Sequence, residues 1–513
     1  MLQVTQVTAR LFNLTLPPLP INPKFHQFIL VTVVIGVGLA VAWLPLTWVF
    51  LLLGGAIFLT LLLIKPILSL YLLIPIIPFS SLLAVPLGNF NAGLMEMVLA
   101  LGIVAWLVQI LARRSPKSQT MNPAPPLLWP CFLFLGGVGL SWLNALSIGA
   151  SLIETTKWVE MLALYLFVVA LLPARHIKWV VSVILLTGLA QAALGLYQFI
   201  FKVGPEGFLL FDGRFLRAYG TFAQPNPYAG YLGLVLPLAL SLTIWAFRDL
   251  RYGIWDIRSN RSHISHLTSH IFFALSFGLL LAALFATQSR GAWVGFALAA
   301  VVTLGVRSKK AAMILITLAL IGALIGLAGS FDWGIANTSV ITQRLVDAVS
   351  IASISDISAI EVNDANFATI ERLAHWQAAR EMWRDHLWLG AGFGNYAVVY
   401  PIYAVGRWLD PLGHAHNYLL NIGAEAGLIG ITAYLIFWIL TFRVSWLALQ
   451  RSQGFNRAVV AGGLGILVHL HIHNLFDNLY VQGMYLHVAI VLALISLICQ
   501  CHPTKPSKER TYQ

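Results

Sequence analysis

Residues 417–442 read NYLLNIGAEAGLIGITAYLIFWILTF. An apolar run of this length crosses a hydrocarbon core of about 30 Å when it is helical. Its opening is nevertheless polar, because His414 and His416 precede the run, Asn417 begins it and Glu425 lies within it. Burying such groups costs several kcal/mol when they have no partners. The stretch therefore predicts a membrane helix that carries functional polar residues at one end.

The composition extends this prediction to the whole chain. Of 513 residues, 59% are hydrophobic and 10% are charged, and the mean hydropathy is +0.83. An ordinary soluble domain carries about 25% charged residues. The sequence thus predicts an all-α, polytopic transmembrane helix bundle with about 12–14 spans.

Fourteen apolar runs are the candidate spans, because a helix needs about 20 apolar residues to cross the membrane. They lie near residues 27–44, 46–64, 66–85, 93–112, 127–145, 158–172, 177–199, 225–247, 271–288, 291–306, 311–329, 417–442, 458–476 and 480–499. We expect no cleavable signal peptide, because the N-terminal segment lacks a charged region followed directly by an apolar core.

The basic residues predict the topology. The formal net charge is +12, but most Lys and Arg residues cluster in alternate loops, as the positive-inside rule requires of cytoplasmic segments. This placement predicts a multi-pass membrane protein with both termini cytoplasmic. It argues against nucleic acid as a partner.

A smaller basic group remains on the predicted external side, against the topological bias. Arginine suits such sites because its planar fork grips phosphate or carboxylate oxygens. The alternative for any one of them is an ion pair with an external acid such as Glu381. The external basic residues are Lys157, Lys202, Arg214, Arg217, Arg290, Arg344, Arg372, Arg380, Arg384 and Arg407.

Five segments organise the chain in this interpretation. They are a cytoplasmic N-terminal segment (1–26), an N-terminal helix array (27–200), a core (201–442) with an external loop at about 330–416, C-terminal helices (443–499) and a basic cytoplasmic tail (500–513). Long loops usually carry function. Within this one, Leu373, Trp376, Gln377, Arg380 and Arg384 recur at helical spacing and predict an amphipathic helix over the outer face of the bundle.

Four stretches together resemble one family. YGTFAQPNPYAGYL (219–232), SRGAWVG (289–295), RLAHWQAAREMWRDHLWLGAGFGNY (372–396) and the set His416, Asn417, Gly427 and Gly430 resemble motifs of the O-antigen ligase and O-antigen polymerase (Wzy-type) superfamily. Members of this superfamily are bacterial membrane glycosyltransferases. The resemblance covers roughly residues 210–435.

The resemblance implies an activity. Such enzymes move a saccharide from a polyprenyl-diphosphate carrier to an acceptor hydroxyl on the outer face of the inner membrane, without a metal ion or other cofactor. The implied partners are the carrier-linked saccharide, membrane lipid and an acceptor glycan, glycolipid or protein. The sequence does not distinguish a ligase from a surface polysaccharide polymerase.

Residue types then suggest roles within that activity. His416 is the predicted catalytic base, because an imidazole has a suitable pKa for taking the acceptor proton. Fixed arginines would stabilise the diphosphate leaving group, and Asn226 is a predicted helix N-cap. The predicted substrate-binding residues are Arg214, Arg217, Asn226, Arg290, Arg372, Arg380, Arg384, His414, Asn417 and Glu425.

Two alternatives complete the interpretation. His469, His471 and His473 alternate in sequence, but residues two apart on a helix point in opposite directions, so we expect no metal site there. From another functional class, an anion or bicarbonate transporter of the same superfamily is the alternative to an enzyme. The external position of the charged residues disfavours it, because carriers usually bind substrate near the middle of the membrane.

Overall fold

The computed structural model describes residues 45–82, 84–87, 90–112, 124–210, 213–253, 262–306 and 366–501, with a few isolated positions besides. The chain divides into two units, residues 1–64 and residues 65–513. In the first unit the described helix is α3 (Leu46–Ile64), which matches the predicted span at 46–64. The predicted spans 27–44 and 311–329 lie almost entirely outside the described residues, as does Arg344.

In its described residues, the second unit is helical apart from two short antiparallel hairpins, β1 with β2 and β3 with β4. This confirms the predicted all-α class. Its first half comprises α4 (Leu68–Ile76), η1 (Ile77–Phe79), β1 (Ala84–Leu87), β2 (Phe90–Gly93), α5 (Leu94–Ala112), α6 (Leu128–Leu140), η2 (Ser141–Asn144), α7 (Ile148–Leu171), η3 (Ala174–His176), α8 (Ile177–Phe201) and η4 (Glu206–Phe208). Its second half comprises β3 (Leu209–Leu210), β4 (Phe215–Leu216), α9 (Pro225–Gly233), α10 (Leu236–Gly253), α11 (Ser262–Ala286), α12 (Arg290–Gly305), α15 (Phe367–Asp385), α16 (Tyr396–Tyr403), α17 (Tyr418–Arg451), α18 (Gly454–His473) and α19 (Met484–Cys501).

Seven helices in the described ranges are long and apolar enough to cross a membrane, and four apolar helices are shorter. Some predicted bounds were wrong. The predicted span 66–85 ends as a helix at Ile76 and continues into a 3-10 turn and the β1–β2 hairpin. The span predicted to start near 158 is α7, which begins at Ile148. The predicted span 225–247 is confirmed by the candidate span Pro225–Phe247, in which a turn at Leu234 and Val235 separates α9 from α10.

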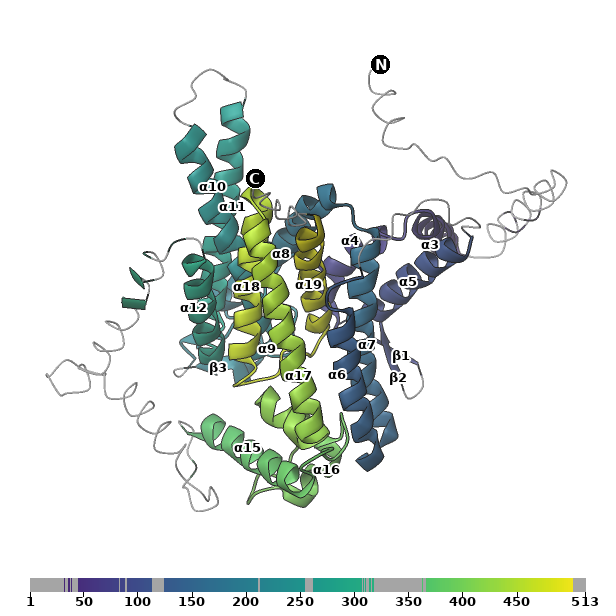
Figure 1. Cartoon of the computed structure of the whole chain (residues 1–513), viewed down its shortest axis with the longest axis vertical. Coiled ribbons are helices and arrows are strands. Elements are labelled where there is room, and N and C mark those ends of the chain that lie inside the picture. Colours follow the sequence, from purple (N-terminus) through teal and green to yellow (C-terminus); the bar gives the residue numbers. More distant parts are fainter. Residues whose placement is uncertain are drawn as a thin grey trace, which may run out of the picture. The chain divides into compact units, whose positions relative to one another are not determined.

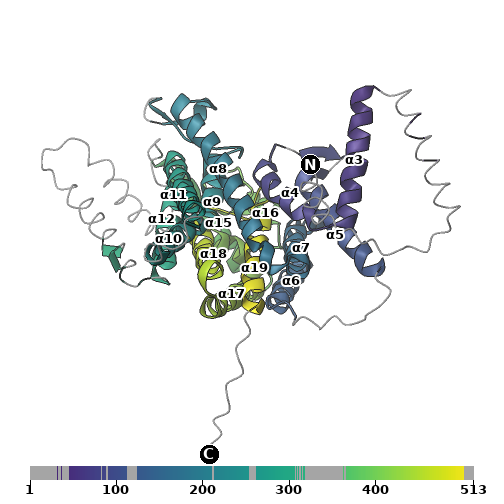
Figure 2. The same ribbon diagram turned by 90° about the horizontal axis from the view of Figure 1, so that it is seen from above.

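Helix α18 packs against α10, α12 and α17, while α6 packs on α17 and α7 on α19. Figures 1 and 2 show α10, α11 and α12 together beside α18. Small residues permit the close approach. A Cβ atom on Gly462 of α18 would lie 2.6 Å from the Cα of Leu238, and one on Gly465 would lie 2.7 Å from the Cβ of Pro237.

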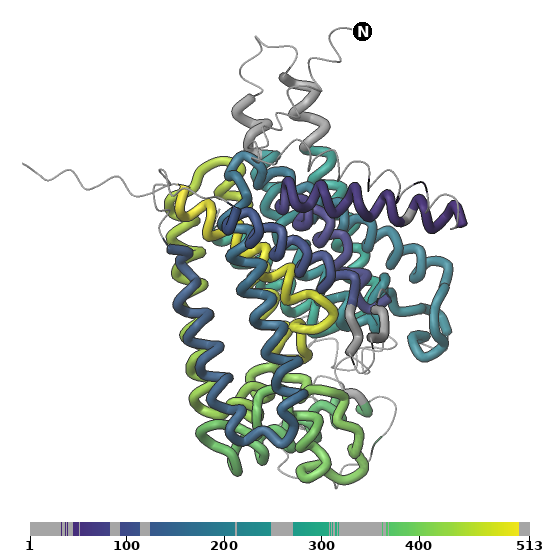
Figure 3. The backbone as a smooth tube through the Cα atoms, turned by 90° about the vertical axis from the view of Figure 1, so that its right-hand side faces the viewer, coloured from purple at the N-terminus to yellow at the C-terminus, as the bar shows by residue number. Residues whose placement is uncertain are grey.

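Helices α15 and α16 lie together at one end of α17, beside the ends of α6 and α7 (Figures 1 and 3). The prediction of a helix in this loop is confirmed by α15. Its buried stripe, however, is formed by Ile370, Ala374, Ala378 and Met382. The residues whose spacing predicted the helix lie on a more exposed face and include the long polar side chains, whereas the buried stripe consists of apolar residues.

The glycine-rich turn that follows α15 packs its backbone on a kink in α17. Gly427 has φ 62° and ψ −162° inside α17, and a Cβ atom there would lie 2.6 Å from the backbone nitrogen of Gly390. Ala391 N–H donates to Ala424 O at 2.8 Å, and Leu428 N–H donates to Leu387 O at 2.8 Å. These contacts join the α15–α16 segment to the membrane helix that begins at the two histidines.

Candidate functional site

His416 lies directly before α17 and has φ 52°, a left-handed conformation that is uncommon for residues other than glycine. Three contacts hold this backbone. Asn417 caps α17, its side chain accepting from Leu419 N–H and Leu420 N–H at 3.1 and 3.2 Å. Trp376 of α15 donates its indole N–H to His416 O at 3.3 Å. Tyr418 N–H donates to Asn474 O at 2.7 Å. Such conformations persist only where the surroundings over-determine them, and they cluster at functional sites.

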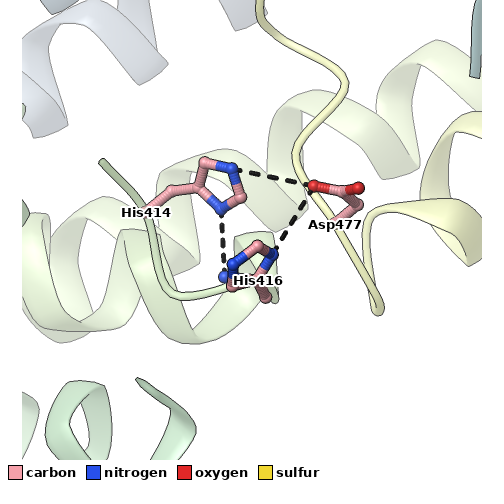
Figure 4. A group of neighbouring side chains, drawn as sticks. All are labelled: His414, His416 and Asp477. Carbon is pink, nitrogen blue, oxygen red and sulfur yellow. Dashed lines mark hydrogen bonds and ion pairs between the residues drawn. The ribbon is translucent and has the colours of Figure 1, made fainter. Parts of the chain in front are cut away.

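His414, His416 and Asp477 converge from two separate loops (Figure 4). Asp477 Oδ1 lies 3.7 Å from His414 Nε2 and 3.8 Å from His416 Nδ1. The carboxylate itself is oriented by Asn478, whose backbone N–H donates to the same oxygen at 2.9 Å. Both ring nitrogens of His416 are buried and make no hydrogen bond. The base predicted from sequence therefore faces a carboxylate and retains nitrogens that can take a proton.

The protonation of the cluster follows from its burial and its charges. Burial lowers the pKa of His414 to about 4, against the opposing pull of Asp477, so this ring is neutral near neutral pH. Burial alone would raise the pKa of Asp477, but the facing His416 and the other neighbouring histidines outweigh it and hold the pKa below its ordinary value. Asp477 is therefore ionised and can stabilise a positive charge on an adjacent imidazole.

Three of the predicted arginines lie near one another and near Asp477. Burial, together with the like charges of Arg372 and Arg290, lowers the pKa of Arg217 to about 10, while Asp477 opposes the shift. A guanidinium with this pKa is still cationic at neutral pH. The structure thus groups Arg217, Arg290 and Arg372 beside the histidine cluster, as a binder of an anion requires.

Asn226 corrects one prediction. Helix α9 begins at Pro225 with Gln224 as its N-cap, so Asn226 is inside the first turn and is not the cap. Its Oδ1 instead accepts from Arg217 Nη2 at 2.8 Å, while Arg217 Nε donates to Thr287 O at 2.9 Å. These two bonds fix the plane of the guanidinium. Asn226 is therefore a positioning residue for Arg217.

Other predicted residues take roles outside this group. Arg380 and Arg384 are exposed and both pair with Glu381, at 3.1 and 3.0 Å, which is the ion-pair alternative. Arg214 is exposed in the turn before β4. Glu425 is buried and accepts from Tyr396 N–H at 2.9 Å, so it orients the segment after the glycine turn. We leave these four, and the capping Asn417, out of the site that we propose.

Sequence reasoning missed two residues. Asp477 is not among the predicted site residues, because nothing in the sequence links its loop to the one that carries His416. His375 of α15 lies within the motif at residues 372–396 but is not among the predicted site residues. Its ring is 5.5 Å from that of His416, is stacked on Tyr400 at 4.7 Å and is 2.9 Å from the Tyr396 hydroxyl. Its position directly before Trp376, within that motif, was the available signal.

The distances within the histidine cluster also decide whether it can hold a metal ion. In the described residues, the ligand atoms of His414, His416 and Asp477 lie within 4.8 Å of one another. Two imidazole nitrogens and a carboxylate oxygen are ligands that a divalent ion such as Zn²⁺ accepts. In α18, His469 and His473 face each other at 3.4 Å, whereas the ring of His471 packs on Trp438 at 4.5 Å. The alternating trio does not converge, as its spacing predicted.

Residues 275–435 match the family model described as O-antigen ligase. This segment is therefore similar to the O-antigen ligase family. The match confirms the superfamily that the four motifs resembled, and it includes Arg290, Arg372 and both histidines of the loop before α17. Arg217 and Asp477 lie on either side of the O-antigen ligase segment and complete the cluster from outside it. No curated protein matches the chain.

Proposed function

We propose that this membrane protein transfers a saccharide from a polyprenyl-diphosphate carrier to an acceptor hydroxyl, as an O-antigen ligase or a surface polysaccharide polymerase. The convergence of His414, His416 and Asp477 beside Arg217, Arg290 and Arg372 carries this proposal. It combines a proton acceptor with a diphosphate-binding group in one place. We further propose that the site faces the periplasm, with both termini cytoplasmic, because the cytoplasmic loops then carry most of the basic residues.

The residues divide the chemistry as follows. His416 takes the proton of the acceptor hydroxyl at a ring nitrogen as the acceptor oxygen bonds to the anomeric carbon. The bond from that carbon to the diphosphate breaks, and its electron pair leaves with the diphosphate. The three arginines stabilise the charge that develops there, as preorganised donors do in other enzymes. Asp477 stabilises the imidazolium that forms on His416.

The proposed reaction needs no metal ion. The arginines supply the positive charge at the leaving group, and the imidazole supplies the base. Since the histidines and Asp477 can also approach one cation, a chelator distinguishes the two uses of this cluster. Transfer that persists in chelator supports the proposal, and transfer that requires an added divalent ion contradicts this part of it.

The test of the proposal is a transfer assay in liposomes that contain the purified protein, carrier-linked saccharide and acceptor. We expect protein-dependent transfer without a membrane potential, and its loss in His416→Ala and in Arg290→Ala. Protein-dependent flux of labelled bicarbonate together with no transfer to any offered acceptor would overturn the assignment in favour of a carrier.

A further inference from the structure

A pocket opens next to the histidine cluster, between the first turns of α15 and the segment that follows α16. It has a volume of about 230 Å³ and is lined by Phe367, Glu371, His375, Trp408 and Asp410, among others. This is many times the space that one water needs. It is smaller than the roughly 300–1,000 Å³ of sites that enclose a drug-sized ligand. Its size therefore suits a single sugar ring.

The pocket combines an apolar ring surface with polar groups at its rim. Phe367 is 40% exposed and its ring lies 4.9 Å from that of Trp408, so an aromatic face is available to a ligand. Asp410 and Arg407 are exposed at the rim, and the Arg407 guanidinium lies 5.4 Å from the centre of the Trp408 ring. Sugars present an apolar C–H face and a hydroxyl edge, and ligand sites generally pair apolar walls with a few polar groups in this way.

The charges of the lining select among sugars. Glu371 and Asp410 contribute two carboxylates and Arg407 one guanidinium. Burial, with smaller contributions from the neighbouring His416 and His414, lowers the pKa of His375 to about 4, so this ring is neutral near neutral pH. The lining is net negative. Carboxylates accept hydrogen bonds from hydroxyl groups and repel a uronate, so the pocket favours neutral or amino sugars over acidic ones.

The pocket lies next to His416, the proposed base. His375 forms part of its wall, and the His375 ring lies 5.5 Å from the His416 ring. Glu371 precedes Arg372 on α15, and the pKa of Glu371 is raised by burial while the charges of His416 and Arg372 oppose the rise. A sugar held in the pocket can therefore present a hydroxyl to His416, while the three arginines bind the diphosphate.

We infer that this pocket is the subsite for the acceptor saccharide and that it holds one neutral or amino-substituted pyranose ring. The inference rests on the proposed function for the identity of the acceptor. The binding of a neutral sugar ring does not depend on it. The two statements therefore have separate tests.

Sugar binding is measured by saturation-transfer difference NMR on the purified full-length protein in nanodiscs. The probes are the methyl glycosides of glucose, N-acetylglucosamine and glucuronic acid. We expect saturation of the ring protons of the first two and a weaker signal from the glucuronide. Phe367→Ala and Asp410→Asn should each weaken binding about threefold to tenfold, the effect of losing one ring contact or hydrogen bond.

Matched controls lie on the same segment outside the pocket. Leu387→Ala removes a side chain that is 48% exposed, and Glu381→Gln removes an exposed carboxylate. Both should leave sugar binding unchanged. Phe367 begins α15 and is 40% exposed, so we expect its replacement to leave the fold intact, and an unchanged unfolding temperature verifies this. Absence of any neutral-sugar signal in the parent, or equal loss in controls and pocket variants, overturns the pocket as a sugar site.

The acceptor assignment is measured by steady-state transfer kinetics. Phe367→Ala should raise the KM for the acceptor about threefold to tenfold and leave the KM for the carrier-linked donor unchanged. A rise in the donor KM alone overturns the acceptor assignment even when sugar binding is retained. Failure of the proposed function would appear differently, as neutral-sugar binding by a protein that transfers nothing in any assay.

Discussion

The backbone N–H of His416 donates to His414 Nδ1 at 3.1 Å. Because Nδ1 accepts this bond, the proton of the neutral His414 ring is on Nε2, which faces Asp477 Oδ1 at 3.7 Å. His414 therefore links the backbone of the proposed base to the carboxylate that faces it. It acts as a positioning residue, and its two ring nitrogens have separate roles.

Substitutions can separate those roles. The amide oxygen of His414→Asn can replace Nδ1 as the acceptor of the His416 N–H, whereas His414→Ala loses both contacts. We expect His414→Asn to retain transfer at a rate clearly above that of His414→Ala, with the difference in kcat and not in donor KM. Turnover in liposomes measures it. Equal rates in the two variants would show that the bond to the His416 backbone does not matter.

His416→Ala should remove the base itself. A general base contributes about 10²- to 10⁴-fold, so we expect kcat to fall by that factor while the amount of membrane-inserted protein stays constant. Single-turnover transfer with saturating donor is the measurement. Near-parental turnover would exclude His416 as the base.

The arginines should divide into two groups. Arg290→Lys keeps the charge but loses the fork, and we expect donor affinity to fall roughly tenfold. Arg384→Ala serves as the matched comparison, because Arg384 is exposed and paired with Glu381, and exposed pairs contribute about 0–1 kcal/mol. Its donor affinity should remain near that of the parent. An equal loss of donor affinity in both variants would show that Arg384 also binds the donor.

Glu425 should matter for the fold of the α15–α16 segment. Its buried carboxylate accepts from Tyr396 N–H at 2.9 Å, and loss of the partner of a buried donor costs about 1–3 kcal/mol. We expect Glu425→Ala to speed hydrogen exchange at residues 390–396 and Glu425→Gln to retain most of the protection. Unchanged exchange in Glu425→Ala would contradict this anchoring role.

Stability should fall in acid. His375 and His414 both have folded-state pKa values of about 4, below the ordinary 6.5. Between these values the unfolded chain binds protons that the folded cluster does not, so the free energy of unfolding decreases as pH falls from about 6.5 to about 4. Asp477, whose pKa is held below 3.8, acts in the same direction only at still lower pH.

The histidine variant His375→Gln tests this pH dependence. It should flatten the dependence of the unfolding temperature on pH between about 6.5 and 4, since one depressed pKa is removed. His386→Gln is a control, because His386 lies beyond the end of α15, outside the cluster. A parallel curve for the parent and His375→Gln would contradict the assigned protonation of His375.

Local patterns in the chain determined the class of the fold. Continuous apolar runs predicted α5, α8, α17, α18 and α19, because a helix in lipid must satisfy its own backbone and expose apolar side chains. They failed where the physical constraint was not local. The 3-10 turn after Ile76 occurs inside the apolar run predicted as the span 66–85, and hydropathy does not record where such a run stops being helical.

The candidate site shows the same division. Residue chemistry and motif order alone indicated His416, His414 and the arginines at 217, 290 and 372. Only the tertiary structure brought Asp477 from the loop after α18 to within 3.8 Å of His416 and placed His375 against the same ring. It also directed Arg380 and Arg384 to Glu381 and Asn226 to Arg217. Partner choice depends on distances between segments that are remote in sequence, and those distances exist only once the helices are packed.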